Sequence, residues 1–325
     1  MPIHPSALSR IALGTALWPL QSDVRTATSI LSRGLEVRIN VVDTAPSYFP
    51  PLEGDSERIL GSALKGLRHE FFVVTKVSPS SGGRLGLAIG GLSGPNFVTS
   101  VNRSLQRLRT DYVDLVVAHG PDFSTPIDET IDAFLALEAQ GKVRFFGLCN
   151  FPQSAVSQAH RRLQSEGRGP VFLQELLNVL TPLRIHRLRS LLAVSPGAKI
   201  MTYAPLAGGV LARSYNRKVP GFPPAGSRAS YLGWTEEPSA EPSTLPSLSD
   251  DGIDVINRFS LWAHQRDMTF AKAALGWVLS HDFVDTSIVG VNNEWQLSTL
   301  FDVQSDIQFN ATEMDDLANY LFARG

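Results

Sequence analysis

The stretch Phe71-Phe72-Val73-Val74-Thr75-Lys76-Val77 has the pattern that decides the fold. It is apolar except for Thr75 and Lys76, and such a short run is typical of a strand buried on both faces of a parallel sheet. Similar runs recur along the chain, and each of them predicts a further strand. They occupy residues 40–43, 112–118, 145–149, 199–203 and 286–289, with weaker candidates at 11–13 and 171–174.

Longer stretches with apolar residues at helical spacing separate these strands. Phe97, Val101 and Leu105, for example, fall on one face of a helix. We expect Gly34 to cap the first helix and Gly141 to end a later one, because glycine is favoured just past a helix end. The predicted helices occupy residues 23–33, 56–64, 97–108, 125–140, 153–166, 253–266, 270–280, 294–301 and 312–322.

A strand followed by a helix, repeated about eight times, predicts an α/β fold of the (β/α)8 TIM-barrel type. A doubly wound sheet is the alternative, but it usually carries a glycine-rich phosphate loop. Neither G-x-G-x-x-G nor G-x-x-x-x-G-K-[ST] occurs in the sequence. We therefore expect residues 1–325 to form a single barrel domain, with a long loop after strand 7, over residues 205–250, and a C-terminal helix.

The composition excludes several classes of protein. The chain has 325 residues, a formal net charge of −2 and one cysteine, Cys149. A nearly neutral chain has no electrostatic footprint for nucleic acid or an anionic membrane, and a single cysteine excludes a disulfide framework. Residues 1–5 lack a signal-peptide pattern, and no apolar run approaches the ~18 residues of a spanning helix. We expect a cytoplasmic protein without a nucleic-acid or membrane partner.

Ionisable residues stand at the ends of three consecutive predicted strands. In a (β/α)8 barrel, the C-terminal ends of the strands carry the chemistry. Asp43 and Lys76 lie at or near the ends of their strands, and His119 directly follows the strand at 112–118. Tyr48 comes shortly after Asp43. Because a lysine in so apolar a run is costly unless its charge is paired, we expect Asp43 to be its counter-ion.

Taken singly, each of these residues has an ordinary structural explanation. Asp43 could cap a turn, and Tyr48 could pack within its loop. Lys76 could be a surface lysine, and His119 could be a core histidine bonded to a backbone carbonyl. These separate explanations do not account for the occurrence of all four residues at the same end of the predicted barrel.

The same residues suggest a reaction. A phenol with a pKa of about 10 is a weak acid near neutrality, but a neighbouring ammonium favours its phenolate form. A carboxylate beside the ammonium keeps that group charged, and a histidine can bond a carbonyl oxygen. Together they could protonate an oxygen while a cofactor delivers a hydride to carbon, because no side chain donates a hydride.

Further motifs extend this pattern through most of the chain. They include INVVDTA at 39–45, SERILG at 56–61, SLQRLRTDYVDL at 104–115, HGPDFSTPIDET at 119–130, GKVRFFGLCN at 141–150 and PLAGGVL at 205–211. In these motifs, and in the order of its Asp, Tyr, Lys and His residues, the sequence resembles the aldo-keto reductase superfamily. Within the superfamily it is most similar to the aflatoxin-aldehyde reductase branch, mainly through the stretch at 119–130.

The resemblance implies a barrel that binds NADP(H) without a Rossmann motif. It implies reduction of a small-molecule aldehyde or ketone to an alcohol by direct hydride transfer, without a metal. Tyr48 resembles the general acid of the family, Lys76 and Asp43 its tuning pair, and His119 the residue that orients the substrate carbonyl. The matching cofactor-binding positions are Asn150 and Gln174 for the carboxamide, Tyr203 for the nicotinamide ring, Pro205, Leu206, Gly208 and Arg213 for the pyrophosphate, and Gly290, Asn292, Asn293 and Gln296 for the adenosine end.

The sequence departs from the family at several of these positions. Serine is common where Cys149 stands, and serine or asparagine where Ala204 stands. Near Gly290 the usual Lys or Arg for the 2′-phosphate of NADP is absent, so NAD(H) is the alternative cofactor. Arg213 could supply the missing charge or could equally be exposed to solvent. Arg228 could meet an acidic substrate, although a lone arginine in a loop is usually solvated.

Two alternative functions belong to other classes. A cofactor-binding regulatory subunit of the same fold, with little or no turnover, would keep the cofactor site. A barrel hydrolase would need a second strand-end acid facing Asp43, and the sequence offers none that is convincing. Both a monomer and a homo-oligomer are compatible with the sequence.

Overall fold

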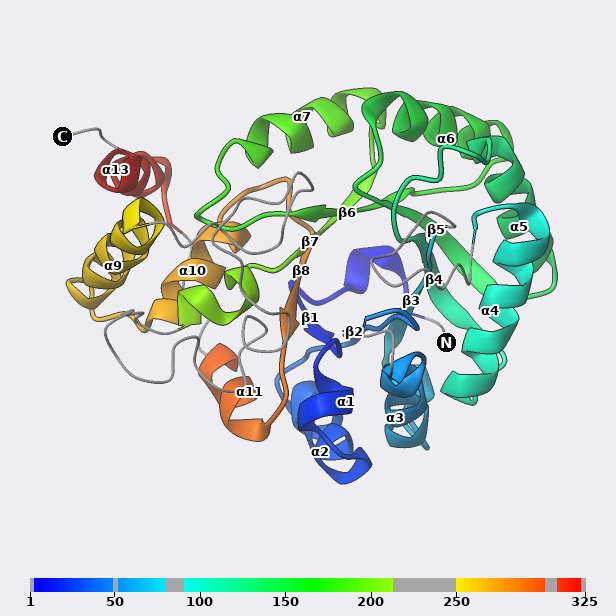
Figure 1. The fold of residues 1–325 in the computed structure, drawn as a ribbon, viewed down its shortest axis with the longest axis horizontal. Coiled ribbons are helices and arrows are strands. Elements are labelled where there is room, and N and C mark those ends of the chain that lie inside the picture. The colour runs from blue at the N-terminus through cyan, green and yellow to red at the C-terminus, as the bar shows by residue number, and fades with distance from the viewer. Residues whose placement is uncertain (1–2, 49–51, 80–90, 213–249, 302–308, 323–325) are drawn as a thin grey trace.

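The computed structural model describes residues 3–48, 52–79, 91–212, 250–301 and 309–322. Its centre is a closed barrel of parallel strands in chain order, in which β8 pairs with β1 (Figure 1). The predicted (β/α)8 barrel is therefore confirmed, the two weaker strand candidates included. The strands are β1 (Ile11–Gly14), β2 (Val41–Asp43), β3 (Phe72–Val77), β4 (Val113–Ala118), β5 (Val143–Cys149), β6 (Phe172–Leu176), β7 (Lys199–Tyr203) and β8 (Thr286–Gly290).

Helices surround the barrel, as Figure 1 shows. Those between strands are α2 (Val24–Glu36), α3 (Asp55–Ala63), α4 (Gly94–Leu108), α5 (Ile127–Ala139), α6 (Gln153–Ser165), α7 (Arg184–Val194), α9 (Asp250–His264) and α10 (Phe270–Leu279). After β8 come α11 (Glu294–Phe301) and the predicted C-terminal helix, α13 (Ala311–Phe322), which packs beside α9. The short elements are η1 (Pro5–Ala7), α1 (Trp18–Gln21), η3 (Arg68–Glu70) and η4 (Ala207–Ala212).

Alternation along the strands decides which side chains point into the barrel. On β3, Phe72 and Val74 belong to an apolar cluster inside the barrel, while Val73 packs in the layer beneath the helices. Because successive side chains of a strand face opposite sides, Lys76 continues the inward series. The same alternation places Gln174 of β6 on the inner face, two residues after an inward phenylalanine.

The end of α2 differs from the prediction. The helix continues to Glu36, so Gly34 is buried within it and does not cap it. A Cβ on Gly34 would lie 3.3 Å from Leu13 Cδ1 and 3.8 Å from Ile39 Cβ. The glycine therefore lets α2 approach the barrel closely. Gly141, by contrast, follows the end of α5 with a φ of +72°, as expected of a glycine that ends a helix.

The chain after β7 leaves the regular alternation of strand and helix. The long segment predicted at 205–250 includes η4, and residues 213–249 lie outside the described ranges. Arg213 and Arg228 fall in this part, so their predicted contacts also lie outside the described residues. Within the described ranges, no helix has the length and apolar character needed to cross a bilayer.

Candidate active site

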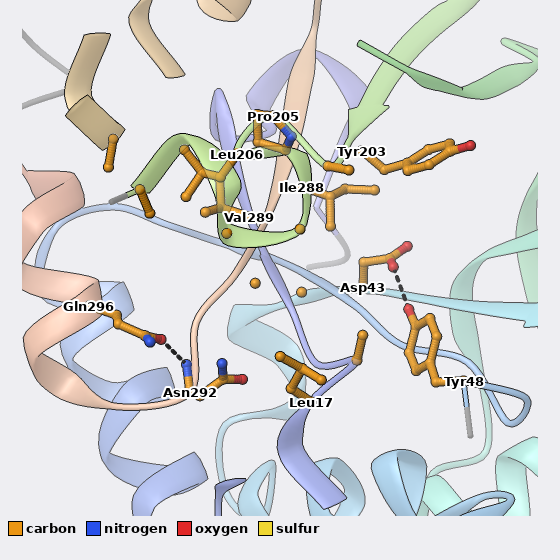
Figure 2. A pocket seen from close by; sticks show the side chains of 18 of the residues that line it. Leu17, Asp43, Tyr48, Tyr203, Pro205, Leu206, Ile288, Val289, Asn292 and Gln296 are labelled. Carbon is orange, nitrogen blue, oxygen red and sulfur yellow. Dashed lines mark hydrogen bonds between the residues drawn. The ribbon is translucent and has the colours of Figure 1, made fainter. Parts of the chain in front are cut away.

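Asp43, Lys76 and Tyr48 meet at the C-terminal end of the barrel. Lys76 Nζ donates to Asp43 Oδ1 at 2.5 Å and to the Tyr48 hydroxyl at 2.9 Å. The Tyr48 hydroxyl donates to Asp43 Oδ1 at 2.9 Å, the bond drawn in Figure 2. Gln174 Nε2 donates to the other carboxylate oxygen, Asp43 Oδ2, at 2.7 Å. Asp43 and Lys76 are only 2% and 3% exposed, and Asp43 is the counter-ion of the lysine.

The turn after β2 supports the ammonium from a further side. Lys76 Nζ also donates to the Thr44 carbonyl oxygen at 2.9 Å. Thr15 Oγ1 donates to Thr44 Oγ1 at 2.8 Å, and Ser56 Oγ of α3 donates to the Thr15 carbonyl oxygen at 2.8 Å. These hydroxyl groups are buried, so they hold the turn without competition from water. The three hydrogen bonds of the ammonium offset the cost of burying its charge.

His119 lies beside Tyr48 in the loop after β4. Their ring centroids are 6.2 Å apart and the rings are nearly perpendicular, at 86°. The backbone N–H of His119 donates to the Val77 carbonyl oxygen at 2.8 Å, which ties it to the end of β3. Ser47 Oγ lies 3.4 Å from His119 Nδ1 and 2.5 Å from Ser78 Oγ. The imidazole and the phenol therefore border one site.

A cavity of about 500 Å³ opens at this end of the barrel. Figure 2 shows Asp43 and Tyr48 on one side of it and Asn292 and Gln296 on the other, with Val289 between them. The cavity thus extends from the ends of β2 and β3 to the start of α11. The predicted site residues that line it are Asp43, Tyr48, Lys76, His119, Asn150, Gln174, Tyr203, Pro205, Leu206, Gly208, Gly290, Asn292 and Gln296.

Asn293 is the described site residue that the structure does not bring to the cavity wall. Its Oδ1 accepts a hydrogen bond from the backbone N–H of Gln296 at 2.9 Å. This geometry satisfies a free N–H group in the first turn of α11, which is the usual task of an asparagine at a helix start. The predicted contact of Asn293 with the adenosine end stays a prediction, and in the structure its side chain caps α11.

Tyr203 and Cys149 line the cavity beside Asn150. Asn150 Nδ2 donates to the Tyr203 hydroxyl at 3.0 Å. Burial, with a smaller contribution from Cys149, raises the pKa of Tyr203 well above its ordinary value. Burial also raises the pKa of the Cys149 thiol to about 12. Both groups stay protonated near neutrality. Among the described residues, no cluster of three or more His, Cys, Asp or Glu is arranged to hold a metal ion.

Several lining residues escaped the sequence analysis. Some end or follow β1, and the strand signal at 11–13 could have indicated them, because the loop after every barrel strand reaches this face. Others lie at the start of α10, and no motif in the sequence associates α10 with the site. These residues include Gly14, Ala16, Leu17, Thr269, Phe270 and Ala271.

Comparison with known proteins places the whole arrangement in a family. The sequence profile of the aldo/keto reductase family matches residues 10–321. A putative voltage-gated potassium channel subunit beta from Schizosaccharomyces pombe is 30% identical over 286 residues, which cover 85% of this chain and 78% of that protein. A probable voltage-gated potassium channel subunit beta from Arabidopsis thaliana is 29% identical over 281 residues, 85% of this chain and 81% of the plant protein.

One of the similar proteins is named as an enzyme. Methylglyoxal reductase YeaE from Escherichia coli is 34% identical over 142 residues, which cover 43% of this chain and 45% of that enzyme. The profile match spans nearly the whole chain, and the barrel has the architecture predicted from the sequence. The chain therefore belongs to the aldo/keto reductase family and is an NAD(P)H-dependent oxidoreductase.

Proposed function

We propose that the protein reduces an aldehyde or ketone to an alcohol, with NAD(P)H as the hydride source and Tyr48 as the proton donor. One observation carries this proposal: Lys76 Nζ lies 2.9 Å from the Tyr48 hydroxyl and 2.5 Å from Asp43 Oδ1, at the wall of a cavity. A phenol held by a buried ion pair and facing a cavity is suited to general acid catalysis. Membership of the aldo/keto reductase family supports the same reaction.

The remaining lining residues fit a nicotinamide dinucleotide. Asn292 Oδ1 is buried and has no hydrogen-bond partner among the described residues, so it can accept a bond from a ligand. Gly209 has a φ of +100° and open space where a Cβ would point, which lets a ligand approach the backbone. Asn150 and Gln174 would hold the carboxamide, and Tyr203 would pack on the ring. When bound, the reduced nicotinamide supplies the hydride that becomes the new C–H bond.

The protein's own residues supply the proton and balance its charge. Tyr48 gives its hydroxyl proton to the carbonyl oxygen as the carbon receives the hydride, so the product is a neutral alcohol. The ammonium of Lys76 stabilises the negative charge that remains on the phenol oxygen, and Asp43 keeps the ammonium in place. The imidazole of His119, beside the phenol, orients the carbonyl oxygen by a hydrogen bond.

Tyr48→Phe tests the assigned proton donor. We expect turnover to fall by a factor of about 10² to 10⁴, the usual contribution of a general acid, while NAD(P)H binding survives because the ring is kept. Turnover is measured by the loss of cofactor absorbance with methylglyoxal, aromatic aldehydes and ketones as substrates. Nucleotide affinity is measured separately by calorimetry.

Tyr320→Phe is the matched control, because it removes a hydroxyl from the exposed side chain of α13, away from the cavity. It should turn over like the unmodified protein. An active Tyr48→Phe protein would refute the role of Tyr48. An unmodified protein that reduces none of the carbonyl compounds would refute the reaction itself.

The choice between NADPH and NADH depends on charge at the far end of the cavity. Lys76 is the only Lys or Arg among the described lining residues, and it lies at the Tyr48 end. A charge-assisted hydrogen bond contributes about 1.5–3 kcal/mol, or roughly 10- to 100-fold in affinity. We therefore propose that NADH and NADPH bind with affinities within about tenfold of each other.

Side-by-side titration with the two reduced cofactors measures this ratio. An NADPH affinity about 100-fold higher would refute the proposal. If Arg213→Ala then abolished the preference for NADPH, Arg213 would be the residue that supplies the missing positive charge, as the sequence analysis allows.

A cofactor-binding subunit with little turnover is the second candidate. The similarity to the potassium channel beta subunits of S. pombe and A. thaliana favours it. This function would keep the nucleotide site but would not require fast proton transfer from Tyr48. Tight NAD(P)H binding together with negligible turnover on every carbonyl compound would favour it over the reductase.

A further inference from the structure

Gln174 reaches across the barrel to Asp43. Gln174 belongs to β6 and Asp43 ends β2, and these two strands face each other across the closed barrel. Gln174 Nε2 donates to Asp43 Oδ2 at 2.7 Å. The two residues are 1% and 2% exposed, so bulk water does not compete for this bond. A single buried hydrogen bond therefore connects two sides of the barrel interior at the end that carries the candidate active site.

The two oxygens of the Asp43 carboxylate have different partners. Oδ1 accepts from Lys76 Nζ at 2.5 Å and from the Tyr48 hydroxyl at 2.9 Å. Oδ2 accepts from Gln174, its one hydrogen-bond partner among the described residues. Because a buried carboxylate oxygen without a donor is costly, this bond fixes the rotation of the carboxylate. With Oδ2 held by Gln174, Oδ1 stays directed at the lysine and the phenol.

This bond differs from the cofactor contact predicted for Gln174. A primary amide has two N–H donors and one carbonyl acceptor, and the bond to Asp43 uses one N–H. The second N–H and the carbonyl oxygen can still meet a ligand in the cavity that Gln174 lines. The bond to Asp43 needs no ligand, so its effect can be measured without cofactor.

The hydrogen bonds around Asp43 set how readily Tyr48 releases its proton. The Tyr48 hydroxyl donates to Asp43 Oδ1, as Figure 2 shows, and such a bond favours the neutral phenol. Without a donor at Oδ2, more negative charge would gather on Oδ1 and hold the phenol proton more tightly. The carboxylate could also turn away from Lys76, whose ammonium favours the phenolate. Both consequences would make Tyr48 a weaker acid.

We propose that Gln174 is a positioning residue, which orients Asp43 and, through Asp43 and Lys76, sets the acidity of Tyr48. The inference deepens the proposed function and rests on it, because that function makes Tyr48 the proton donor. It gives Gln174 a task in proton transfer besides the predicted contact with the carboxamide.

Gln174→Met tests the inference, because methionine has a similar length and volume but cannot donate a hydrogen bond. NMR of protein labelled with ¹³C at tyrosine Cζ follows the ionisation of each phenol without cofactor, and Tyr48→Phe identifies the Tyr48 signal. The pKa of Tyr48 should rise by about 0.5–1, a three- to tenfold weaker acid. This is part of the roughly 10- to 100-fold that a hydrogen bond to a charged group contributes.

Two comparisons show whether the effect passes through Asp43. In an Asp43→Asn background, Gln174→Met should change the ionisation constant of Tyr48 by less than about twofold, because no carboxylate is left to orient. Asn150→Gly is the matched control: it removes another amide that lines the cavity, but this amide bonds Tyr203 at 3.0 Å. Asn150 has a φ of +57°, which glycine adopts freely. This control should leave the pKa of Tyr48 unchanged.

Gln174→Glu provides a second test that depends on the contact alone. Two buried carboxyl groups in contact cannot both ionise, so one of them keeps a proton and its pKa is raised above the unfolded value. The folded protein then binds more protons than the unfolded chain. The urea midpoint of this variant, relative to the unmodified protein, should therefore fall as the pH rises from about 5 to 9. A difference in midpoint that does not vary with pH would contradict the contact with Asp43.

The outcomes separate this inference from the reductase function. If the unmodified protein reduces carbonyl compounds but Gln174→Met leaves the pKa of Tyr48 unchanged, the positioning role is wrong and the reductase function stands. The role is also wrong if Gln174→Met has an equal effect in the Asp43→Asn background. If the pKa of Tyr48 responds as expected but no carbonyl compound is reduced, the positioning role stands and the reductase function is wrong.

Discussion

Cys149 lines the cavity but sits in surroundings that suppress its reactivity. The side chain is buried at the end of β5, and Asn150 Nδ2 lies 3.4 Å from its sulfur. Burial raises the pKa of the thiol to about 12, and the positive charge of Lys76 offsets only part of that rise. Because the thiolate is the reactive form, the thiol is close to inert near neutrality. The residue therefore serves as a small, apolar part of the cavity wall.

Iodoacetamide at pH 8 should therefore leave the folded protein unmodified. The thiol becomes reactive only as the pH rises towards its raised pKa, so alkylation should increase above pH 10. The denatured protein should take up one equivalent, because the chain has one cysteine. Mass spectrometry of the intact protein counts the adducts. Rapid alkylation of the folded protein at pH 8 would contradict both the burial and the raised pKa.

At the scale of single elements, the strands were predictable because burial on both faces leaves a simple apolar signal. The same signal hides which residues face inward, since Phe72, Val73 and Val74 look alike in the sequence. The closed barrel assigns Phe72 and Val74 to its interior, and it confirms the predicted pairing of Lys76 with Asp43. The candidate catalytic residues could still be found, because their positions at or just after strand ends can be recognised without knowing which side chains of the strand face inward.

Helix ends were predicted less well, because they depend on tertiary contacts. Glycine is a common residue at a helix end, but Gly34 lies within α2, where it allows the helix to approach the barrel closely. The sequence predicts a cofactor contact for Asn293 and does not reveal that its side chain caps the first turn of α11. The lining residues of α10 were missed for a related reason, since α10 reaches the cavity only when the barrel closes.

The motif at residues 119–130 begins in the loop after β4, and the hydrogen bonds of Asp122 explain part of it. Burial alone would raise the pKa of Asp122, but hydrogen bonds from Ser124, the Leu92 N–H and Thr125 outweigh it and hold the pKa well below its ordinary value. Asp122 therefore anchors the loop that directly follows His119. The narrower similarity to the aflatoxin-aldehyde reductase branch, which depends on this motif, stays a prediction.

In the whole molecule, β4 joins two ends of the barrel with different tasks. His119 follows its C-terminal end and borders the cavity. Asp114 lies near its N-terminal end, buried, and accepts from Arg68 at 2.8 Å, from Arg144 at 2.6 Å and from the Val73 N–H at 3.0 Å. A barrel concentrates chemistry at the first end and stability at the second. Substitutions of His119 and Asp114 should therefore separate the effect on catalysis from the effect on stability.

Asp114→Asn should destabilise the fold by about 3–5 kcal/mol, because it leaves two partly buried arginines without their counter-ion. Its kcat and KM at 20 °C should stay near those of the unmodified protein, since the cavity lies at the opposite end of the strand. His119→Ala should do the reverse and lower kcat at least tenfold with little change in unfolding free energy. Urea unfolding and steady-state kinetics of both variants measure the two effects. A large kcat loss in folded Asp114→Asn would mean that the two ends of β4 are coupled, and the separation of tasks would then fail.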